Sequence, residues 1–323
     1  MFNKLVMFLC FALLTGVGAL QAQSNISRLD DDQIRANRIS SITEWNHPVI
    51  NSKPAENGTI SLTARYDNDG FQVEEITYNS QGEESRKVTS RFDSNGNRIE
   101  YLVYDSRNNR LTYSRMTSFD ENGNRIAEWG FDGIGDYRNE YRLNSDGRPA
   151  EIHYNAGGNL KEKRIFVYDG NRTAISVILP GSIVKEKIYL INDNSGNLLT
   201  ESYYDNNGNL KRKVEYSYDG GLKTAERHFQ EDQMQYRKIF FYAQSMLTKV
   251  VRVDRQGRET VTRKYIYDDL GRVIEESWYN ENSGKYSSRE YSYDNLGNMQ
   301  SVATYYATYS FRVLYKYDYS FFR

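Results

Sequence analysis

The chain has almost no cysteine. Its single cysteine, Cys10, lies in the apolar run of residues 5–20. A chain without further thiols forms no disulfide framework, offers no thiolate ligands to a metal and has no cysteine nucleophile. The sequence therefore predicts a protein that tolerates oxidising surroundings without depending on them for stability.

Long hydrophobic runs are missing after residues 5–20. This run precedes Ala22 and has the pattern of a secretory signal peptide. It is shorter than the roughly 20 residues that span a bilayer. A lipid-anchored Cys10 would need a small residue before it, where Leu9 stands. We expect residues 1–22 to be a signal peptide, with no transmembrane span after its removal, and a mature protein in the periplasm, at the cell surface or outside the cell.

The chain also lacks a charge bias. It has 42 basic and 43 acidic side chains and a formal net charge of −1, so no basic surface is expected to hold a nucleic-acid backbone. The three histidines, His47, His153 and His228, do not have the spacing of a metal site. Proline is scarce, with four residues, which suits a fold that uses its backbone N–H groups in sheets.

Motifs for catalysis are missing as well. There is no Gly-x-Ser-x-Gly nucleophile elbow. Glutamates recur instead in the expected strands, at Glu83, Glu84, Glu100, Glu128, Glu275 and Glu276. Their repetition favours cross-strand pairing with Lys and Arg over one pair of catalytic acids. We therefore predict a protein that is not an enzyme and that has no cofactor and no metal site.

Tyrosine is abundant, with 28 residues, and it marks a repeat of about 25 residues. An aromatic-acid pair, or a remnant of one, recurs at Tyr66-Asp67, Phe92-Asp93, Phe119-Asp120, Leu143-Asn144, Tyr168-Asp169, Ile191-Asn192, Tyr218-Asp219, Tyr242-Ala243, Tyr267-Asp268, Tyr293-Asp294 and Tyr317-Asp318. Each unit of such an array buries its apolar face against its neighbours. Repetition therefore predicts many similar surfaces and disfavours one unique site.

Each repeat has the pattern of a β-hairpin. In residues 210–218, Val214, Tyr216 and Tyr218 alternate with polar residues, which is the period of a half-buried strand. The strand around Ile274 and Trp278 is less one-sided, which indicates that both faces of the sheet are partly covered.

Turn sequences separate the expected strands. Asp starts the turn by accepting bonds from its own backbone, and a Gly three residues later adopts positive φ. The turn positions are Asp93, Gly96, Asp120, Gly123, Asp205, Gly208, Asp268, Gly271, Asp294 and Gly297. The pattern is lost at residues 179–181, 229–234 and 242–247, where we expect irregular loops. These turns do not match a calcium hand-loop, in which Gly stands at position six and a Glu closes at position twelve.

The pattern resembles the YD-repeat (RHS-repeat) family, in its compact secreted form. The residues that carry the resemblance are Tyr267-Asp268-Asp269-Leu270-Gly271-Arg272-Val273, Tyr293-Asp294-Asn295-Leu296-Gly297-Asn298 and Tyr66-Asp67-Asn68-Asp69-Gly70. The resemblance covers residues 59–319 and implies stacked antiparallel hairpins, which in large family members form a shell around a toxic passenger. Here the last copy lies near residue 323, so we expect no passenger to be enclosed.

The expected fold is all-β. Residues 23–58 form an N-terminal segment with an opening strand at 38–45 and an irregular loop at 46–58. Residues 59–323 form an elongated, twisted or curled antiparallel meander of about ten hairpins. About twenty strands spaced 4.8 Å apart would extend roughly 95 Å if flat, and twist makes the strip curl.

Three hypotheses for function remain. The first is a non-enzymatic exported binding or scaffold module for a glycan or a protein partner, with Trp129 and Trp278 as candidate ligand-stacking residues. The second, implied by the resemblance alone, is an accessory protein of a secreted RHS-type toxin system. The third is an outer-membrane β-barrel, which would need an apolar lipid-facing band where strands such as residues 211–218 carry Lys and Arg.

Overall fold

The chain folds almost wholly into β-strands. The computed structural model describes residues 31–323, so the expected signal peptide and Cys10 lie outside the described residues. The short helix α1 (Asp31–Ala36) precedes β1 (Ile39–Ile50) and the two-residue β2 (Lys53–Pro54). The next strands are β3 (Thr59–Tyr66), β4 (Gln72–Tyr78), β5 (Glu84–Phe92), β6 (Arg98–Asp105), β7 (Arg110–Phe119), β8 (Arg125–Phe131), β9 (Asp136–Leu143), β10 (Pro149–Ala156), β11 (Asn159–Asp169) and β12 (Arg172–Leu179). The last are β13 (Ile183–Asn192), β14 (Leu198–Asp205), β15 (Leu210–Asp219), β16 (Leu222–Gln230), β17 (Gln233–Ala243), β18 (Met246–Asp254), β19 (Glu259–Tyr267), β20 (Val273–Asn280), β21 (Lys285–Tyr293), β22 (Met299–Tyr306) and β23 (Phe311–Phe321).

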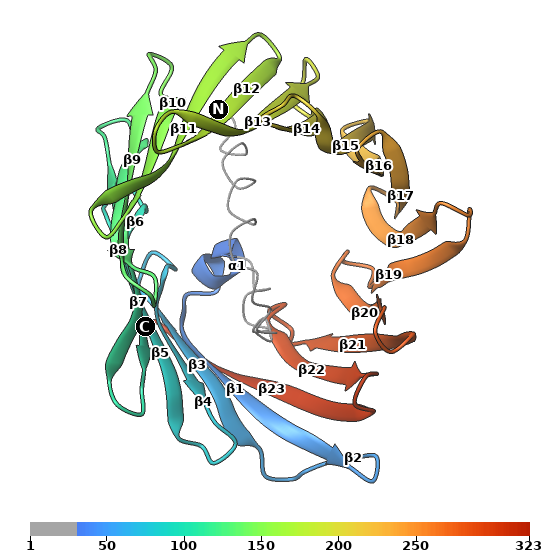
Figure 1. The fold of residues 1–323 in the computed structure, drawn as a ribbon. Helices are drawn as coiled ribbons and strands as arrows, with labels where there is room; N and C mark the ends of the chain where they lie inside the picture. The colour runs from blue at the N-terminus through green and yellow to red at the C-terminus, as the bar shows by residue number, and fades with distance from the viewer. Residues whose placement is uncertain (1–30) are drawn as a thin grey trace.

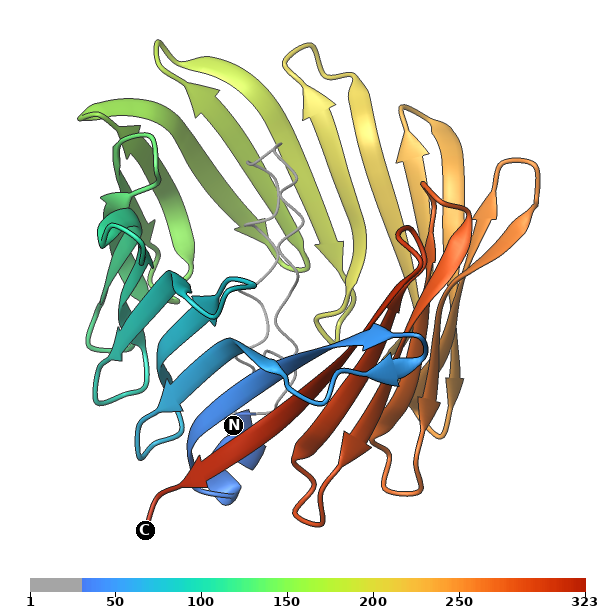
Figure 2. The same cartoon turned by 90° about the horizontal axis from the view of Figure 1, so that it is seen from below.

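From β3 onward each strand pairs antiparallel with the next, so the expected all-β antiparallel meander is confirmed. The expected elongated, curled meander is corrected in one respect: it closes on itself, because β1 pairs with both β3 and β23. The β1–β23 register extends from Ile39 opposite Phe321 to Pro48 opposite Val313. The sheet thus closes into a 22-stranded barrel, with β2 as a short addition to β1 (Figures 1 and 2).

Closure has a physical cause in the twist of the sheet. Neighbouring strands rotate relative to one another, so a long meander curves until its first and last strands can meet. Pairing then satisfies the two exposed edges, which would otherwise present unpaired N–H and C=O groups. A ring of 22 strands, 4.8 Å apart and tilted by about 40°, is roughly 45 Å across, which is too wide for wall side chains alone to fill.

The N-terminal segment is more ordered than its sequence indicates. We expected an irregular loop from residue 46, but β1 continues to Ile50 and turns into β2. His47 holds this end of β1, because its Nδ1 lies 2.9 Å from the carbonyl oxygen of Ala55. The domain boundaries at residues 22 and 58 stay predictions, although β1 belongs to the same barrel as the repeats.

The Asp-x-x-Gly turns have a shared geometry. In the turn after β14, the Gly208 N–H donates to the Asp205 carbonyl at 3.1 Å, and Asp205 Oδ1 accepts from the N–H groups of Asn207 and Asn209. Gly208 has a φ of 82° and Gly271 one of 77°. The same positive φ occurs at the other turn glycines, Gly96, Gly123 and Gly297. The backbone hydrogen bond from Asn209 is the main cause that lowers the pKa of Asp205, to about 2.

The loops expected to be irregular are tight turns. Two residues link β16 to β17 and two link β17 to β18. Gln244 and Ser245 have φ values of 50° and 67°. A two-residue turn with both central residues at positive φ therefore joins β17 to β18. The expectation failed because polar residues other than Gly adopt the required backbone conformation here.

A β-bulge interrupts most strand pairs close to a turn. The register shifts between Arg91 and Phe92 of β5, for example, where Phe92 lies opposite Arg98 and leaves Ile99 without a partner. One extra residue reverses the alternation of side chains, so Arg98 and Tyr101 of β6 point to the same face. Simple counting along the chain therefore assigns faces wrongly near the turns.

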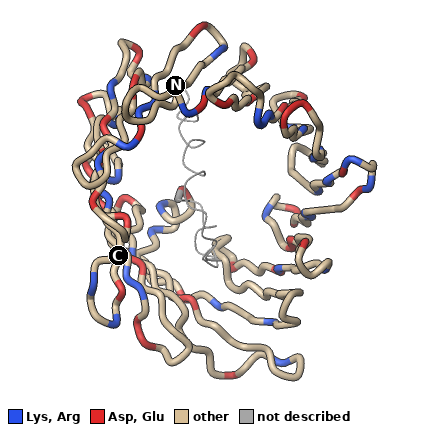
Figure 3. The backbone as a smooth tube through the Cα atoms, in the orientation of Figure 1, with Lys and Arg blue, Asp and Glu red and all other residues tan. Residues whose placement is uncertain are grey.

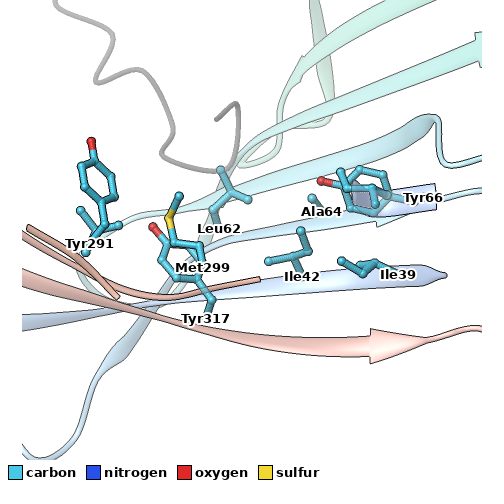
Figure 4. Packing of buried hydrophobic residues seen from close by; sticks show 10 residues of the cluster. Ile39, Ile42, Leu62, Ala64, Tyr66, Tyr291, Met299 and Tyr317 are labelled. Atoms are coloured by element: carbon cyan, nitrogen blue, oxygen red, sulfur yellow. The ribbon is translucent and has the colours of Figure 1, made fainter. Parts of the chain in front are cut away.

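The best-buried core lies where α1 covers the inside of the barrel. Ile34 of α1 packs in one cluster with Ile42, Leu62, Tyr66 and Val302. Figure 4 shows wall residues of this cluster from β1 and β3 and from the last three strands, β21, β22 and β23. Asn37, which directly follows the helix, contacts the turn before β22, since its Nδ2 donates to Asn298 Oδ1 at 2.7 Å. The core thus joins the two ends of the meander across the seam.

Candidate ligand-binding site in the barrel lumen

The helix α1 identifies which side chains face the lumen. It lies inside the ring of strands (Figure 1), so the wall residue Ala64, which packs in the cluster of Ile34, points inward. Residues directly opposite in neighbouring strands share a face. Ala64 lies opposite Glu75, Glu75 lies opposite Val88, and Val88 lies opposite Val103. These residues of β4, β5 and β6 therefore also point inward. The same procedure assigns the faces of the other strands.

The outer face carries ion pairs around the ring. These pairs are Lys87 with Glu74 at 2.7 Å, Arg91 with Glu100 at 3.4 Å, Arg142 with Glu151 at 3.4 Å and Lys213 with Glu215 at 2.9 Å. Charged residues accordingly occur on strands all around the ring in Figure 3. Lys or Arg on a lipid face costs about 2–4 kcal/mol near the middle of a membrane. The outer face thus carries paired charges together with exposed apolar side chains such as Val167, Tyr189 and Ile266.

The inner wall carries a repeated tyrosine hydrogen bond. In at least five places within residues 31–323, a tyrosine near the end of one strand donates its hydroxyl to a backbone carbonyl of the preceding strand, at 2.6–2.9 Å. The donors are Tyr168, Tyr242, Tyr267, Tyr293 and Tyr319, and the acceptors are Pro149, Lys223, Leu247, Val273 and Met299. We call these bonds the tyrosine clamps. They explain why Tyr recurs in the sequence, and they assign these tyrosines to the structure of the wall.

Glutamates paired with cations form a second feature of the inner wall. Glu128 and Glu276 are 2% and 4% exposed and lie 3.2 Å from Arg125 and 3.1 Å from Arg289. Burial tends to raise the pKa of Glu226, but hydrogen bonds from His228 and Lys223 and the nearby Lys238 outweigh it, so the pKa lies below its usual value. Glu276 and Arg289 pair across neighbouring strands, as the cross-strand interpretation of the glutamates predicts, whereas Arg125 lies on the same strand as Glu128.

A cavity of about 660 Å³ lies on the inner wall over β5, β6 and β7. Its lining includes Arg86, Arg98 and Arg115, with Tyr101 and Tyr113 between them. The two rings are 6.0 Å apart and nearly perpendicular. The guanidinium groups of Arg98 and Arg115 lie 5.5 and 5.6 Å from the Tyr101 ring centroid. Positive charge and aromatic surface therefore meet at one place on the wall.

A row of alternating cations and rings connects this cavity to α1. Arg35 of the helix lies over Phe71 at 5.6 Å, Phe71 stacks on Phe92 at 4.7 Å, and Arg98 lies over Phe92 at 5.3 Å. Each such contact contributes about 0.5–1 kcal/mol at partly exposed sites. The helix thus helps to hold Arg98 at the cavity.

The two tryptophans singled out from the sequence do not meet. Trp129 faces outward on β8, is 38% exposed and has the Arg138 guanidinium 5.7 Å from its ring centroid. Trp278 faces the lumen on β20, with Arg289 over its ring at 5.1 Å. Because they lie on opposite faces of the wall, they cannot belong to one site, and a stacking role stays a prediction for each.

Sequence reasoning does not single out the cavity residues. Their alternation was the available signal, since Tyr101 and Val103 share one face of β6, and Tyr113 and Arg115 share one face of β7. Alternation alone does not say which face is inward, and the bulge beside Arg98 breaks it. In residues 31–323 no group of three or more His, Cys, Asp or Glu side chains is placed to hold a metal. None of the helices in this range is long and apolar enough to cross a membrane.

No family model and no curated protein matches the chain. A porin-like protein from Bacteroides uniformis is similar in structure, with 10% identity, a TM-score of 0.32 and coverage of 88% of this chain and 97% of that one. A porin-like protein from Bacteroides vulgatus has 11% identity and a TM-score of 0.23, with coverage of 87% of this chain and 98% of that one. The Photorhabdus luminescens Tc holotoxin pore has 10% identity and a TM-score of 0.29, with coverage of 85% of this chain and 18% of that one. With TM-scores below 0.5, these likenesses decide neither family nor function.

Proposed function

We propose that the protein is an exported, non-enzymatic β-barrel that binds a ligand on its inner wall. The observation that carries the proposal is the cavity over β5–β7, where Arg86, Arg98 and Arg115 surround two tyrosine rings. Cavities of about 300–1,000 Å³ with a few convergent polar groups are the usual form of small-molecule sites. Elsewhere on the wall, Tyr168, Tyr242, Tyr267, Tyr293 and Tyr319 are used in the clamps and Glu128, Glu201 and Glu276 in ion pairs.

A binding function fits these groups better than catalysis. The buried carboxylates of the wall are neutralised by neighbours, as Glu201 is by Arg212 at 3.1 Å and Glu276 by Arg289. A general acid or base needs a pKa near the working pH, whereas the pKa of Glu226 is lowered. The absence of enzymatic activity is part of the proposal.

The test uses residues 23–323 on a glycan array that spans neutral and acidic sugars. Val103 lines the cavity and Leu102 is its outward neighbour on β6, so Val103→Trp fills the site and Leu102→Trp is the matched control. We expect Val103→Trp to weaken binding at least tenfold and Leu102→Trp to leave it within twofold. Circular dichroism and thermal unfolding check that both variants fold. Binding that survives Val103→Trp, or no binding to any glycan, contradicts the proposal.

An outer-membrane barrel is the second candidate. The observation in its favour is the closed ring with an even number of antiparallel strands, which is the form of bacterial outer-membrane barrels. The ion pairs on the outer face, such as Lys87 with Glu74, disfavour it. Expression of residues 23–323 separates the two candidates: folding in buffer without detergent supports the first, and folding only with detergent supports the second. The accessory role in a toxin system stays a prediction, tested by co-purification of an effector.

A further inference from the structure

We propose that the cavity over β5–β7 binds an acidic saccharide, that is, a sugar that bears a carboxylate or sulfate group. The inference rests on the proposed function and names the class of its ligand. It depends on the charge balance at the cavity, which differs from that at Arg125, Arg212 and Arg289 elsewhere on the inner wall.

The cavity has more positive than negative charge. Arg86 lies 3.2 Å from Glu75, and Asp105 at the rim is held by Arg107 through two bonds of 2.9 and 3.0 Å. The hydrogen bonds from Arg107 lower the pKa of Asp105, so this carboxylate is ionised and already paired. No carboxylate of residues 31–323 forms an ion pair with Arg115. An anion is thus the group that would balance the cavity.

The rest of the wall shows the contrast. Arg125, Arg212 and Arg289 each have a glutamate within 3.2 Å, and those glutamates are buried. Their charges are balanced within the wall and leave nothing for a ligand. At the cavity Arg115 lies instead over the Tyr101 ring, with its guanidinium available to a bidentate carboxylate or sulfate.

The aromatic surface indicates a sugar in place of a simple anion. Tyr113 lines the cavity nearly perpendicular to Tyr101, and its hydroxyl lies 3.5 Å from that of Tyr137. A tyrosine ring offers an apolar surface to the C–H face of a pyranose, and its hydroxyl can bond to a sugar hydroxyl. A cavity of 660 Å³ has room for several sugar units, which a free sulfate or phosphate ion would not use.

The experiment measures binding by calorimetry with residues 23–323 and four probes: tetragalacturonate, a sulfated disaccharide, neutral maltotetraose and inorganic sulfate. We expect at least one acidic saccharide to bind at least tenfold more tightly than maltotetraose and sulfate. Its affinity should fall between about 50 and 500 mM salt, because screening weakens charge pairing. The comparison between the carboxylate and sulfate probes identifies the source of the anion.

Variants then locate the site. Arg115→Gln should lower the affinity for the acidic probe at least tenfold, and Arg115→Lys should lower that affinity less. Arg263 is the matched control, because it faces the lumen opposite Trp278 on β20 and forms no ion pair in residues 31–323. Arg263→Gln should leave affinity within twofold. Equal losses in Arg115→Gln and Arg263→Gln would overturn the proposal, since any lumen cation would then serve.

The failures of the two proposals can be told apart. If maltotetraose binds as tightly as tetragalacturonate and Val103→Trp blocks both, the cavity binds ligands and the acidic class is wrong. If an acidic probe binds and Val103→Trp has no effect, the site lies elsewhere and both proposals fail.

Discussion

Removal of one tyrosine clamp should destabilise the barrel by a defined amount. Tyr267 Oη donates to the Leu247 carbonyl at 2.7 Å, and burial raises the pKa of Tyr267. A net hydrogen bond contributes about 0.5–1.5 kcal/mol, and a carbonyl left without its partner costs up to about 3 kcal/mol when it is buried. This bond is only partly buried, so Tyr267→Phe should lower the free energy of unfolding by about 1 kcal/mol.

The control lies two residues earlier on the same strand. Tyr265 faces the lumen with its ring 6.5 Å from that of Tyr267, and its hydroxyl has no partner in residues 31–323. Tyr265→Phe should change the free energy of unfolding by less than about 0.5 kcal/mol. Urea unfolding of residues 23–323 measures both variants, and hydrogen exchange shows whether the loss centres on β18–β20. Equal effects of the two substitutions would refute a clamping role for the hydroxyl.

Three further predictions concern the turns and the titratable wall. A Cβ at Gly208 would meet no atom within 4 Å, but its φ is 82°, so Gly208→Val should cost about 1 kcal/mol or more through backbone strain. Hydrogen exchange should show loss of protection centred on residues 195–220; uniform loss along the chain would contradict the nearest-neighbour account of the array. The pKa of Asp205 lies at about 2 and below its unfolded value, so its stabilising contribution is present above about pH 4 and is lost as the pH falls towards 2. Carbon-13 titration of its carboxylate should give a midpoint near 2, Asp205→Asn should remove this pH dependence, and a midpoint near 3.8 would refute it. The turn at Asn144 is a natural control, because its amide oxygen accepts the same two backbone bonds without titrating. Burial raises the pKa of Tyr141 and Tyr267 above 10, so their contribution is complete below pH 10 and is lost as the pH rises through the folded values. Absorbance at 295 nm should show tyrosinate forming together with unfolding, and ionisation at pH 10 without loss of stability would contradict this.

The local structure was predictable because its signals are local. The turn at Asp205 and Gly208 follows from four residues, and the alternation in β15 follows from Val214, Tyr216 and Tyr218. These short patterns determine strands, turns and the order of the meander. They do not predict that the sheet closes into a ring. Closure depends on contacts between distant residues, such as the 2.7 Å hydrogen bond from Trp45 Nε1 to Asp318 Oδ2, 273 residues apart.

The candidate site was beyond the sequence for a related reason. The role of Arg115 depends on which face of β7 is inward, and that face is set by α1 and by closure of the ring. Trp129 illustrates the same limit, since its strand pattern did not show that it points away from the lumen. A bulge of one residue, as beside Arg98, is enough to reverse a face.

Closure of the ring is tested most directly by a disulfide across the β1–β23 seam. Ser41 and Ser320 are directly opposite each other and face outward, and residues 23–323 contain no native cysteine. Opposed residues in antiparallel strands have the Cα separation that a disulfide needs. Ser41→Cys with Ser320→Cys should oxidise within one chain and migrate faster on a non-reducing gel, whereas Ser41→Cys with Ser176→Cys on β12 should stay reduced. A seam variant that stays reduced, or that yields only dimers, would show that the first and last strands do not pair and that the sheet is open.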